Sequence, residues 1–344
     1  VEAALFGDNV PIAVYDQLIK AVRDNLPAVH RYYDLRKRIM GLDEIHFYDC
    51  YVPLVPELEQ KHTWDAGVQL VVESLTPLGR EYCQRLERGL SGRWCDRYPN
   101  AGKQSGAFSS GTYDSDPYIL MNFQAEAIEH VFTLAHEAGH SMHTRFSAEA
   151  QPYEYSGYTI FVAEVASTFN EQLLARLLLS RVKSPKERAA ILVREIDSIR
   201  ATIVRQTMFA EFERRSHASA EAGEPLTLER IRGMYRELLG AYFGPNFVVD
   251  KQLELECLRI PHFYNAFYVY KYATGLSAAI TLAKKVAEGG PRELDAYLNF
   301  LKGGCSKWPL DLLRDAGVDL EKPEPVSTAL AQFGLLVDEL GTLL

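Results

Sequence analysis

Apolar residues recur at helical spacing over most of the chain, and this pattern predicts a mainly α-helical protein. In residues 12–40 the apolar positions Val14, Leu18 and Val22 lie four apart, as on one face of an amphipathic helix. Pro27 is expected to kink or split this helix, because proline lacks an amide hydrogen. Long stretches of helix formers predict helices at residues 124–146, 160–180, 184–217 and 227–239. Helices are also expected at residues 64–90, 250–259, 262–287 and 292–301, with terminal helices from residue 311.

Two stretches break the helical pattern. Residues 43–56 are aromatic and β-branched, which predicts a strand or an extended connection. Residues 100–122 are rich in Gly, Ser and Asp, and the short β-prone runs Gly106–Ser110 and Tyr118–Phe123 predict a hairpin or small sheet. No linker or repeat divides the sequence. We therefore expect one mostly helical domain over residues 1–344, with a small β element just before the helix at 124–146.

Composition and charge narrow the class of protein. The 344 residues are 47% hydrophobic and 24% charged, as in an ordinary globular protein. The net charge of −9 argues against a nucleic-acid partner, since a polyanion requires a basic face. Apolar runs such as Leu173–Leu179 are too short to span a bilayer. We expect no nucleic acid and no membrane, and the sequence leaves the oligomeric state open.

Cysteine usage predicts a cytoplasmic protein. Five cysteines lie far apart and form no CxxC pair, which favours reduced thiols. The first residues lack the basic and apolar regions of a secretory signal. The chain begins with Val1 rather than Met, so a natural start and a targeting segment can lie upstream.

Candidate metal chemistry lies in residues 133–147, where His136 and His140 flank Glu137. In a helix the two histidines are one turn apart on one face, so both can point a nitrogen at one Zn²⁺. Glu137 projects beside them and can reach a metal-bound water, the arrangement of zinc peptidases. Gly139 is unfavourable inside a helix by about 1 kcal/mol, which indicates that a backbone, a metal site or a substrate approaches closely there.

A carboxylate on the following helix can complete a zinc site that leaves one position for water. We prefer Glu164 as this third ligand, because it lies nearer the start of that helix. Its surroundings are otherwise apolar, and a buried charge there needs a partner, which a bound cation would supply. Glu171, two turns further along, faces the same way and can hydrogen-bond a ligand histidine. His130 and His143 are interpreted as packing or supporting residues.

Four segments resemble, in the same order, the oligoendopeptidase F branch of the thimet-type oligopeptidases. The segments are HEAGHSMH, FVAEVASTFNE, IPHFYNAFYVYKYATG and GGCSKWPLDLLRDAGVD. The stretch GKQSGAFSSGTYDSDPYILMNF is similar to the family's segment just upstream of its zinc helix. Separate matches across most of the chain are far more specific than the five-residue HExxH pattern alone.

The resemblance implies a helical zinc endopeptidase that cuts internal bonds of short, unstructured peptides in a deep channel. Residue by residue, it implies that His136, His140 and Glu164 hold one Zn²⁺. It further implies that Glu137 is the general base and that Glu171 occupies a supporting position. Members of this branch normally carry a further N-terminal region that forms part of the channel wall. We expect this chain to lack it, as a truncated, proteolysed or naturally short form.

The segment IPHFYNAFYVYKYATG offers hydrogen-bond donors for the oxyanion that forms when a peptide carbonyl is attacked. It predicts a helix with His262 in the first turn. Tyr264, Tyr268 and Tyr272 would then form one stripe, which a core helix could also show. Buried tyrosine hydroxyls need partners, and the family places a histidine and tyrosines of this segment over the substrate carbonyl. We therefore favour His262 and Tyr268 as catalytic donors. Tyr264 and Tyr270 are the next candidates.

Two alternatives stay open at this point. A zinc carboxypeptidase of a related helical fold would need a cation for the substrate carboxylate, and Arg145, Arg200 and Arg205 are candidates. An inactive truncated fragment that binds peptides is the second alternative. In either case, an exposed edge of the predicted hairpin could bind an extended peptide through backbone groups.

Overall fold

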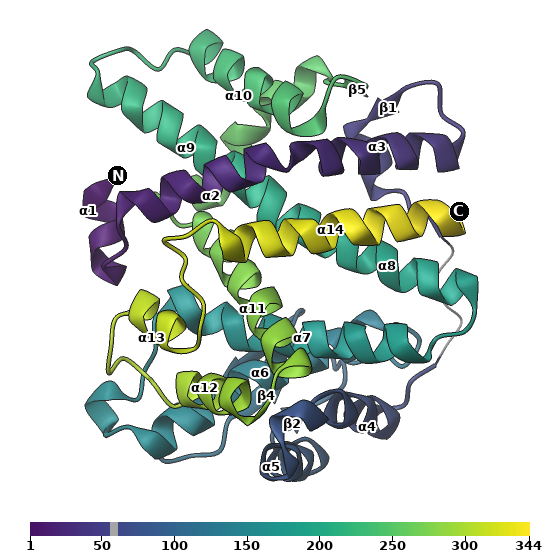
Figure 1. Cartoon of the computed structure of the whole chain (residues 1–344), viewed down its shortest axis with the longest axis vertical. Coiled ribbons are helices and arrows are strands. Elements are labelled where there is room, and N and C mark those ends of the chain that lie inside the picture. Colours follow the sequence, from purple (N-terminus) through teal and green to yellow (C-terminus); the bar gives the residue numbers. More distant parts are fainter. Residues whose placement is uncertain (56–60) are drawn as a thin grey trace. The chain divides into compact units, whose positions relative to one another are not determined.

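The described residues fold mainly as α-helices, and the mainly α fold class is confirmed (Figure 1). The structure is a computed structural model that describes residues 1–55 and 61–344. The α-helices are α1 (Glu2–Leu5), α2 (Ile12–Asp24), α3 (Leu26–Met40), α4 (Trp64–Ser74), α5 (Arg80–Ser91), α6 (Glu129–Ala150), α7 (Ile160–Arg181), α8 (Pro185–Ile199), α9 (Gln206–Glu221), α10 (Leu228–Phe243), α11 (Tyr270–Glu288), α12 (Pro291–Leu301), α13 (Pro309–Asp315) and α14 (Glu324–Leu343). The strands are β1 (Ile45–His46), β2 (Cys95–Asp96), β3 (Phe108–Ser110), β4 (Tyr118–Leu120) and β5 (Phe247–Val248).

The chain divides into two compact units. Unit 1 comprises Val1–Glu57, Ser184–Ser277 and Leu320–Leu344, and unit 2 comprises Leu58–Lys183 and Ala278–Asp319. Each unit is therefore assembled from segments that are distant in the sequence. The expectation of a single domain over residues 1–344 stays a prediction.

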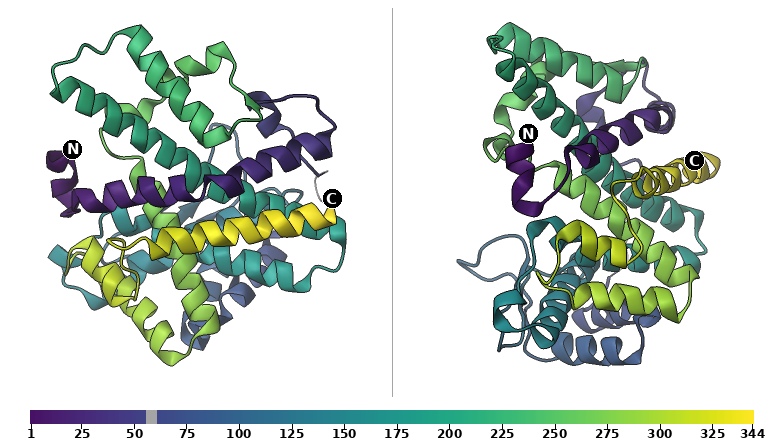
Figure 2. Two further views of the ribbon diagram at one scale, coloured as in Figure 1. Left: turned by 45° about the horizontal axis from the view of Figure 1, so that its top comes forward. Right: turned by 60° about the vertical axis from the view of Figure 1, so that its left-hand side comes forward.

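In unit 1 the C-terminal helix α14 lies beside α2, α3 and α8, and its position next to α2 and α3 is visible in Figure 2. Tyr32 of α3 packs edge-on against Phe333 of α14, with ring centroids 6.1 Å apart. Pro27 lies in the first turn of α3, and α2 ends at Asp24, so the predicted helix at 12–40 is split at the proline. Strands β1 and β5 pair in parallel, which places Ile45 and His46 against the segment after α10.

Unit 2 contains the antiparallel helices α6 and α7 and a three-stranded sheet of order β2-β4-β3. Strands β3 and β4 pair antiparallel with Ser109 opposite Ile119, so the hairpin predicted within residues 100–122 is confirmed. Strand β2 adds in parallel on the other side of β4, with Cys95 opposite Ile119. The sequence did not predict β2, because two residues are too few to show a strand pattern.

The predicted helix at 262–287 is wrong in its first third. Residues Pro261–Tyr264 form a short 3-10 helix (η7), and α11 begins only at Tyr270. Between them Phe267 has a φ of 58°, in the left-handed region that ends a helix. Consequently, Tyr264, Tyr268 and Tyr272 do not lie on one helical stripe.

Other predicted elements differ in detail. Residues 64–90 contain α4 and α5, separated by the 3-10 helix η3 (Thr76–Leu78). Helices α8 and α9 are joined by a π-helical segment, η5 (Arg200–Arg205), and residues 250–259 form the 3-10 helix η6 (Lys251–Arg259). Residues 43–56, of which Pro56 lies outside the described residues, contain β1 and the 3-10 helix η2 (Phe47–Tyr51).

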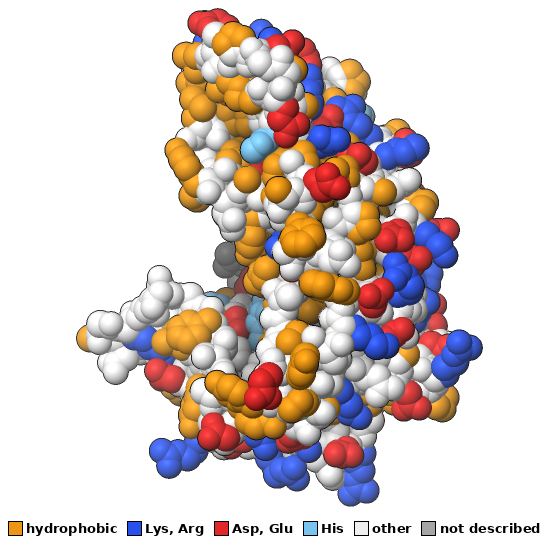
Figure 3. Space-filling model, turned by 90° about the vertical axis from the view of Figure 1, so that its left-hand side faces the viewer, with side chains coloured by type: hydrophobic (Ala, Val, Ile, Leu, Met, Phe, Trp, Pro, Cys, Tyr) orange, Lys and Arg blue, Asp and Glu red, His pale blue; other side chains and the backbone are white. Residues whose placement is uncertain are grey.

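The surface agrees with the composition. On the face drawn in Figure 3, acidic and basic side chains are interspersed, and apolar side chains lie between them. None of the described helices combines the length and apolar character that a membrane crossing requires.

Candidate metal centre

Helices α6 and α7 approach each other closely at Gly139. A Cβ atom at this position would lie 2.5 Å from the carbonyl oxygen of Ala166 and 2.6 Å from the Cα atom of Ser167. Any side chain here would push α7 away, because packed backbones leave no room for it. The side-chain amide of Asn170 also donates to the carbonyl of Ala135, at 3.0 Å, and fastens the same two helices. The expectation that another backbone approaches Gly139 is confirmed.

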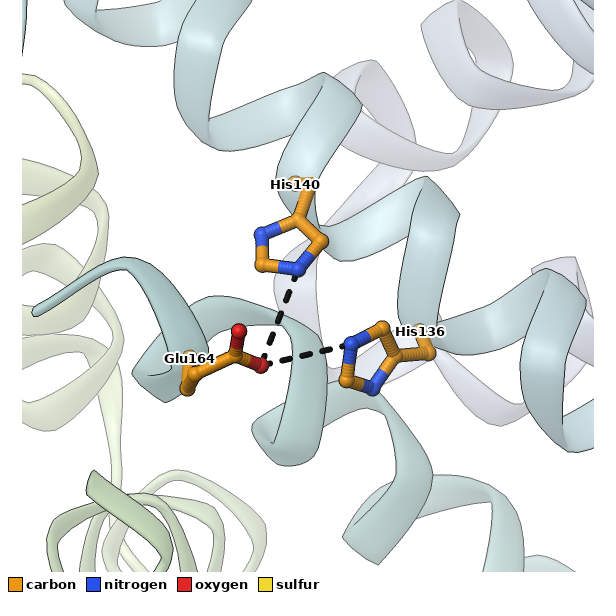
Figure 4. A group of neighbouring side chains, drawn as sticks. All are labelled: His136, His140 and Glu164. Atoms are coloured by element: carbon orange, nitrogen blue, oxygen red, sulfur yellow. Dashed lines mark ion pairs between the residues drawn. The ribbon is translucent and has the colours of Figure 1, made fainter. Parts of the chain in front are cut away.

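The close approach brings together three potential metal ligands (Figure 4). The Nε2 atoms of His136 and His140, one turn apart on α6, lie 3.3 Å and 3.7 Å from Oε2 of Glu164 on α7. Ligand atoms about 2.0–2.1 Å from a tetrahedral zinc ion are about 3.3 Å from one another. One donor atom of each residue lies within 4.8 Å of the other two. The donor set and its spacing therefore fit one Zn²⁺.

Both histidine rings are oriented by hydrogen bonds on their far side. Oε1 of Glu171 lies 2.7 Å from Nδ1 of His136, so the Nε2 atom of that ring faces the other carboxylate. The ring of His140 has the backbone carbonyl of Ala163 as its hydrogen-bond acceptor. Contacts of this kind fix the tautomer and direction of a metal-binding imidazole.

The charges of the three proposed ligands are coupled, and a proton on His136 offsets the negative charge of the carboxylates. Burial disfavours the charged form of His136, but its hydrogen bonds to Glu164 and Glu171 outweigh burial and raise its pKa to about 10. Burial likewise opposes ionisation of Glu164, yet the hydrogen bond and charge of His136 bring its pKa to about 2. Burial and the charge on His136 lower the pKa of His140 to about 4. Two carboxylates thus share one positive ring, and a divalent cation would replace that proton with a larger positive charge.

Glu137 differs from its neighbours because half of its carboxylate has no partner. The residue is only 6% exposed, and Oε2 has no hydrogen-bond partner among the described residues. The backbone N–H of Ser109 in β3 donates to the same carboxylate. Burial raises the pKa of Glu137 above its ordinary value, although His136 partly opposes this shift. A buried carboxylate with one unpartnered oxygen and a raised pKa can accept a proton from a water that enters the site.

The hairpin lies directly over this part of α6. The hydroxyls of Ser109 on β3 and Ser141 on α6 are 2.8 Å apart. Strand β3 pairs with β4 on one side and, among the described residues, with no strand on the other. The edge strand is therefore fixed next to Glu137, where an extended peptide could add to it.

The other histidines of this region have packing roles. His143 is buried and stacks on Tyr158 with ring centroids 3.8 Å apart, and burial lowers its pKa to about 3. The Nδ1 atom of His130 accepts a hydrogen bond from the backbone N–H of Gln124 at 2.6 Å. Their interpretation as packing or supporting residues agrees with these contacts.

The remaining predicted site residues lie in unit 1, where the structure gathers some and separates others. The rings of His262, Tyr268 and Tyr272 contact one another, and Tyr272 Oη lies 3.5 Å from His262 Nε2. Tyr264 is 91% exposed and stands apart from this cluster, whereas Tyr270 is buried. Tyr272, which was not among the favoured donors, is a member of the cluster.

Sequence reasoning missed several supporting groups. Ser167 Oγ donates to Glu164 Oε2 at 3.1 Å, and a serine one turn from a ligand carries no distinctive pattern. The contact of the turn at Gly304 with the connection between α6 and α7 was also missed. There Tyr155 O accepts from the N–H of Cys305 at 2.9 Å, which anchors the connection between α6 and α7.

Known proteins are similar to this chain in sequence and in structure. A sequence profile of Peptidase family M3 matches residues 1–332. Oligopeptidase PepF of Bacillus subtilis is 47% identical over 343 residues, which are 100% of this chain and 51% of that protein. The crystal structure of oligoendopeptidase-F from Enterococcus faecium superposes with a TM-score of 0.80 at 34% identity, covering 99% of this chain and 55% of the other. A crystallised protein from Chlamydophila abortus superposes with a TM-score of 0.94 at 42% identity, covering 100% and 57%. The chain thus spans about half the length of these proteins.

Proposed function

The chain belongs to Peptidase family M3, and on this premise we propose that it carries the catalytic centre of a zinc-dependent endopeptidase. Its substrates would be short, unstructured peptides, cut at internal bonds. The observation that carries the proposal is the grouping of His136, His140 and Glu164, with the unpartnered oxygen of Glu137 beside it.

The ligand roles follow from the donor set. Two imidazoles and one carboxylate are the protein ligands of many catalytic zinc sites, which keep a fourth position open. A bound Zn²⁺ supplies Lewis acidity for the scissile carbonyl and lowers the pKa of water. Glu171 holds His136 in the orientation that directs Nε2 to the site.

Glu137 acts as the general base in this proposal. Its Oε2 accepts the proton of the attacking water and later returns it to the leaving amine. The raised pKa suits this role, because a base of very low pKa would hold the proton too weakly to transfer it onward. The N–H of Ser109 keeps the other side of the carboxylate fixed.

Donors to the substrate carbonyl are proposed from unit 1. His262 is exposed and Tyr268 is partly exposed, and their rings lie 6.1 Å apart with an interplanar angle of 22°. An imidazole N–H and a phenol O–H from this pair would stabilise the oxyanion. Tyr264 and Tyr270 remain weaker candidates, because one stands apart from the cluster and the other is buried.

The carboxypeptidase alternative receives less support from the arginines that it needs. Each of the three arginines already forms an ion pair with a carboxylate of this chain. The nitrogen–oxygen distances are 2.8 Å for Arg145, 2.9 Å for Arg200 and 2.7 Å for Arg205. Recognition of a peptide C-terminus would have to break one of these pairs. We also propose a cytoplasmic location, which the five unpaired cysteines favour.

The test uses a quenched-fluorescent peptide blocked at both ends, with zinc analysis of the purified protein. The parent should contain zinc and cleave the peptide internally. Glu137→Gln should keep zinc and lose activity, while the exposed Glu154→Gln should retain both. Equal cleavage by the parent and Glu137→Gln would remove Glu137 from its role. Zinc-loaded parent protein that binds the peptide without cleaving it would support the inactive-fragment alternative.

A further inference from the structure

A buried carboxylate outside the metal centre has no role in the mechanism so far. Glu213 lies on α9 in unit 1 and is 3% exposed. Its Oε1 accepts a hydrogen bond of 2.9 Å from the backbone N–H of Phe267, and its Oε2 has no partner among the described residues. Burial raises the pKa of Glu213 to about 7. Burying a carboxylate costs free energy that a single hydrogen bond from a neutral donor does not offset. The position of Glu213 therefore needs an explanation.

The donor belongs to an unusual residue. Phe267 and Asn9 are the two described non-glycine residues with positive φ, and a bulky side chain disfavours that conformation. The ring of Phe267 is buried, and it contacts Tyr15 and His217 at centroid distances of 5.6 Å and 4.7 Å. Tyr15 is fixed in turn, since its hydroxyl donates to the carbonyl of Ala210 on α9 at 2.6 Å. Backbone and side chain of Phe267 are thus both anchored to the helix that carries the carboxylate.

The turn at Phe267 determines which side chains meet. In a continuous α-helix, positions 262 and 268 are six steps of about 100° apart and lie on different faces. Here the rings of His262 and Tyr268 are nearly parallel, and Tyr272 completes the cluster at 5.4 Å from Tyr268. The left-handed turn is therefore what sets the proposed carbonyl donors side by side.

We propose that Glu213 is a positioning residue, whose hydrogen bond to the N–H of Phe267 fixes the turn that brings His262 beside Tyr268 and Tyr272. This inference rests on the proposed function, in which His262 and Tyr268 contact the substrate carbonyl. Glu213 itself touches neither substrate nor metal. Its effect reaches the reaction through the geometry of the loop at 265–269.

The experiment compares Glu213→Leu, which removes the acceptor at similar size, with Glu213→Gln, which keeps it. Zinc content, kcat and KM on the quenched-fluorescent peptide, and amide hydrogen exchange in residues 262–272 are measured for each. Glu213→Leu should keep zinc, exchange faster at Phe267, and lose at least tenfold in kcat with a smaller change in KM. Glu213→Gln should restore slow exchange and most of kcat.

A matched control separates positioning from general destabilisation. Glu211 lies on the same helix but pairs with Arg23 at 2.6 Å and with the hydroxyl of Tyr242 at 2.9 Å. Glu211→Gln should lower stability without changing exchange in residues 262–272. In a Tyr268→Phe background, Glu213→Leu should cause little further loss of kcat, because both act through the same donor.

Three outcomes would overturn the inference: unchanged exchange at Phe267 in Glu213→Leu, equal losses in the Leu and Gln variants, or full additivity with Tyr268→Phe. If Glu213→Leu does not fold, the amide exchange of the unmodified protein still tests the inference. Rapid exchange of the Phe267 amide there would also overturn it. Failure of the proposed function is recognised separately, since it would leave Glu137→Gln as active as the parent. The exchange measurement does not depend on activity at all.

Discussion

Glu171 and Glu164 reach opposite nitrogens of the His136 ring, at 2.7 Å from Nδ1 and 3.3 Å from Nε2. The two glutamates lie two turns apart on α7, so one helix face supplies both a proposed ligand and the group that orients another ligand. The ring is thereby held on both sides, and its direction depends on Glu171.

Replacing Glu171 should weaken zinc binding without removing a ligand. In Glu171→Gln, the charge that favours and orients His136 is lost, and losses of about 10–100-fold in metal affinity are typical for such groups. Competition with a chromophoric zinc chelator measures the change, and Glu154→Gln serves as the control. Equal affinities in the two variants would show that His136 needs no orienting partner.

Removing the metal should lower thermal stability. The native cluster holds the donors in place and the unfolded chain does not, so zinc at 100 times its Kd would add about 2.7 kcal/mol of stability. Melting curves with and without a chelator test this. Glu164→Gln should show a much smaller chelator effect than the parent, and a chelator effect of the same size in both would argue against Glu164 as a ligand.

Gly139→Ala should separate α6 from α7. The added Cβ would overlap the backbone at Ala166, at a cost of roughly 1–3 kcal/mol for overpacking, and it should also weaken zinc binding. Gly240 on α10 provides the matched control, since nothing lies within 4 Å of a Cβ there and alanine should stabilise by about 0.4–1 kcal/mol. Urea denaturation of both variants measures the difference. A neutral Gly139→Ala would mean that the helices can shift without cost.

Tyr268→Phe should lower kcat while zinc stays bound. Loss of one oxyanion donor typically costs about 100–1,000-fold in kcat. Tyr48→Phe, at an exposed position elsewhere in unit 1, should leave kcat unchanged. If Tyr268→Phe behaves like Tyr48→Phe, the cluster of His262, Tyr268 and Tyr272 serves packing alone.

Glu213 should make stability fall as pH rises. Burial raises the folded-state pKa from its usual 4.5 to about 7. Below pH 4.5 the carboxyl is protonated in both states, and between 4.5 and 7 only the unfolded chain ionises, so its contribution to stability is lost over that window. Glu213→Gln removes this titration, and its stability relative to the parent should rise by roughly 3 kcal/mol from pH 4.5 to pH 8.

Urea denaturation across this pH range tests the prediction. Tyr15, which faces Glu213, has a pKa raised far above the window and stays neutral throughout. His217, which contacts Phe267, is present in both proteins and cancels in the comparison. Parallel pH profiles for parent and variant would contradict the raised pKa.

The sequence predicted what depends on short-range patterns. Helical patterns located α6 and α7, and the i, i+4 histidines with a glutamate near the start of the next helix made His136, His140 and Glu164 candidates, which the family resemblance then supported. Gly139 was also informative, because glycine inside a helix is unfavourable unless space requires it. Each of these signals lies within one or two helices.

What the sequence could not show depends on distant partners. Tyr264, Tyr268 and Tyr272 have the spacing of one helical face, and yet the α-helix begins only at Tyr270. The Phe267 amide instead donates to Glu213, 54 positions away. Tertiary contacts of this kind override local propensity. Strand β2 was missed for a related reason. Its two residues form a strand only because they pair with β4, which is distant in the sequence.

The proximity of α6 and α7 along the chain has a consequence for the order of folding. His136 and Glu171 are 35 positions apart, and both remaining proposed ligands fall inside that interval. Closing so short a loop costs little entropy compared with bringing in residues 278–319, which complete unit 2. We therefore expect a nascent helical hairpin to capture the ion early, so that the metal acts as a template on which the later segments assemble.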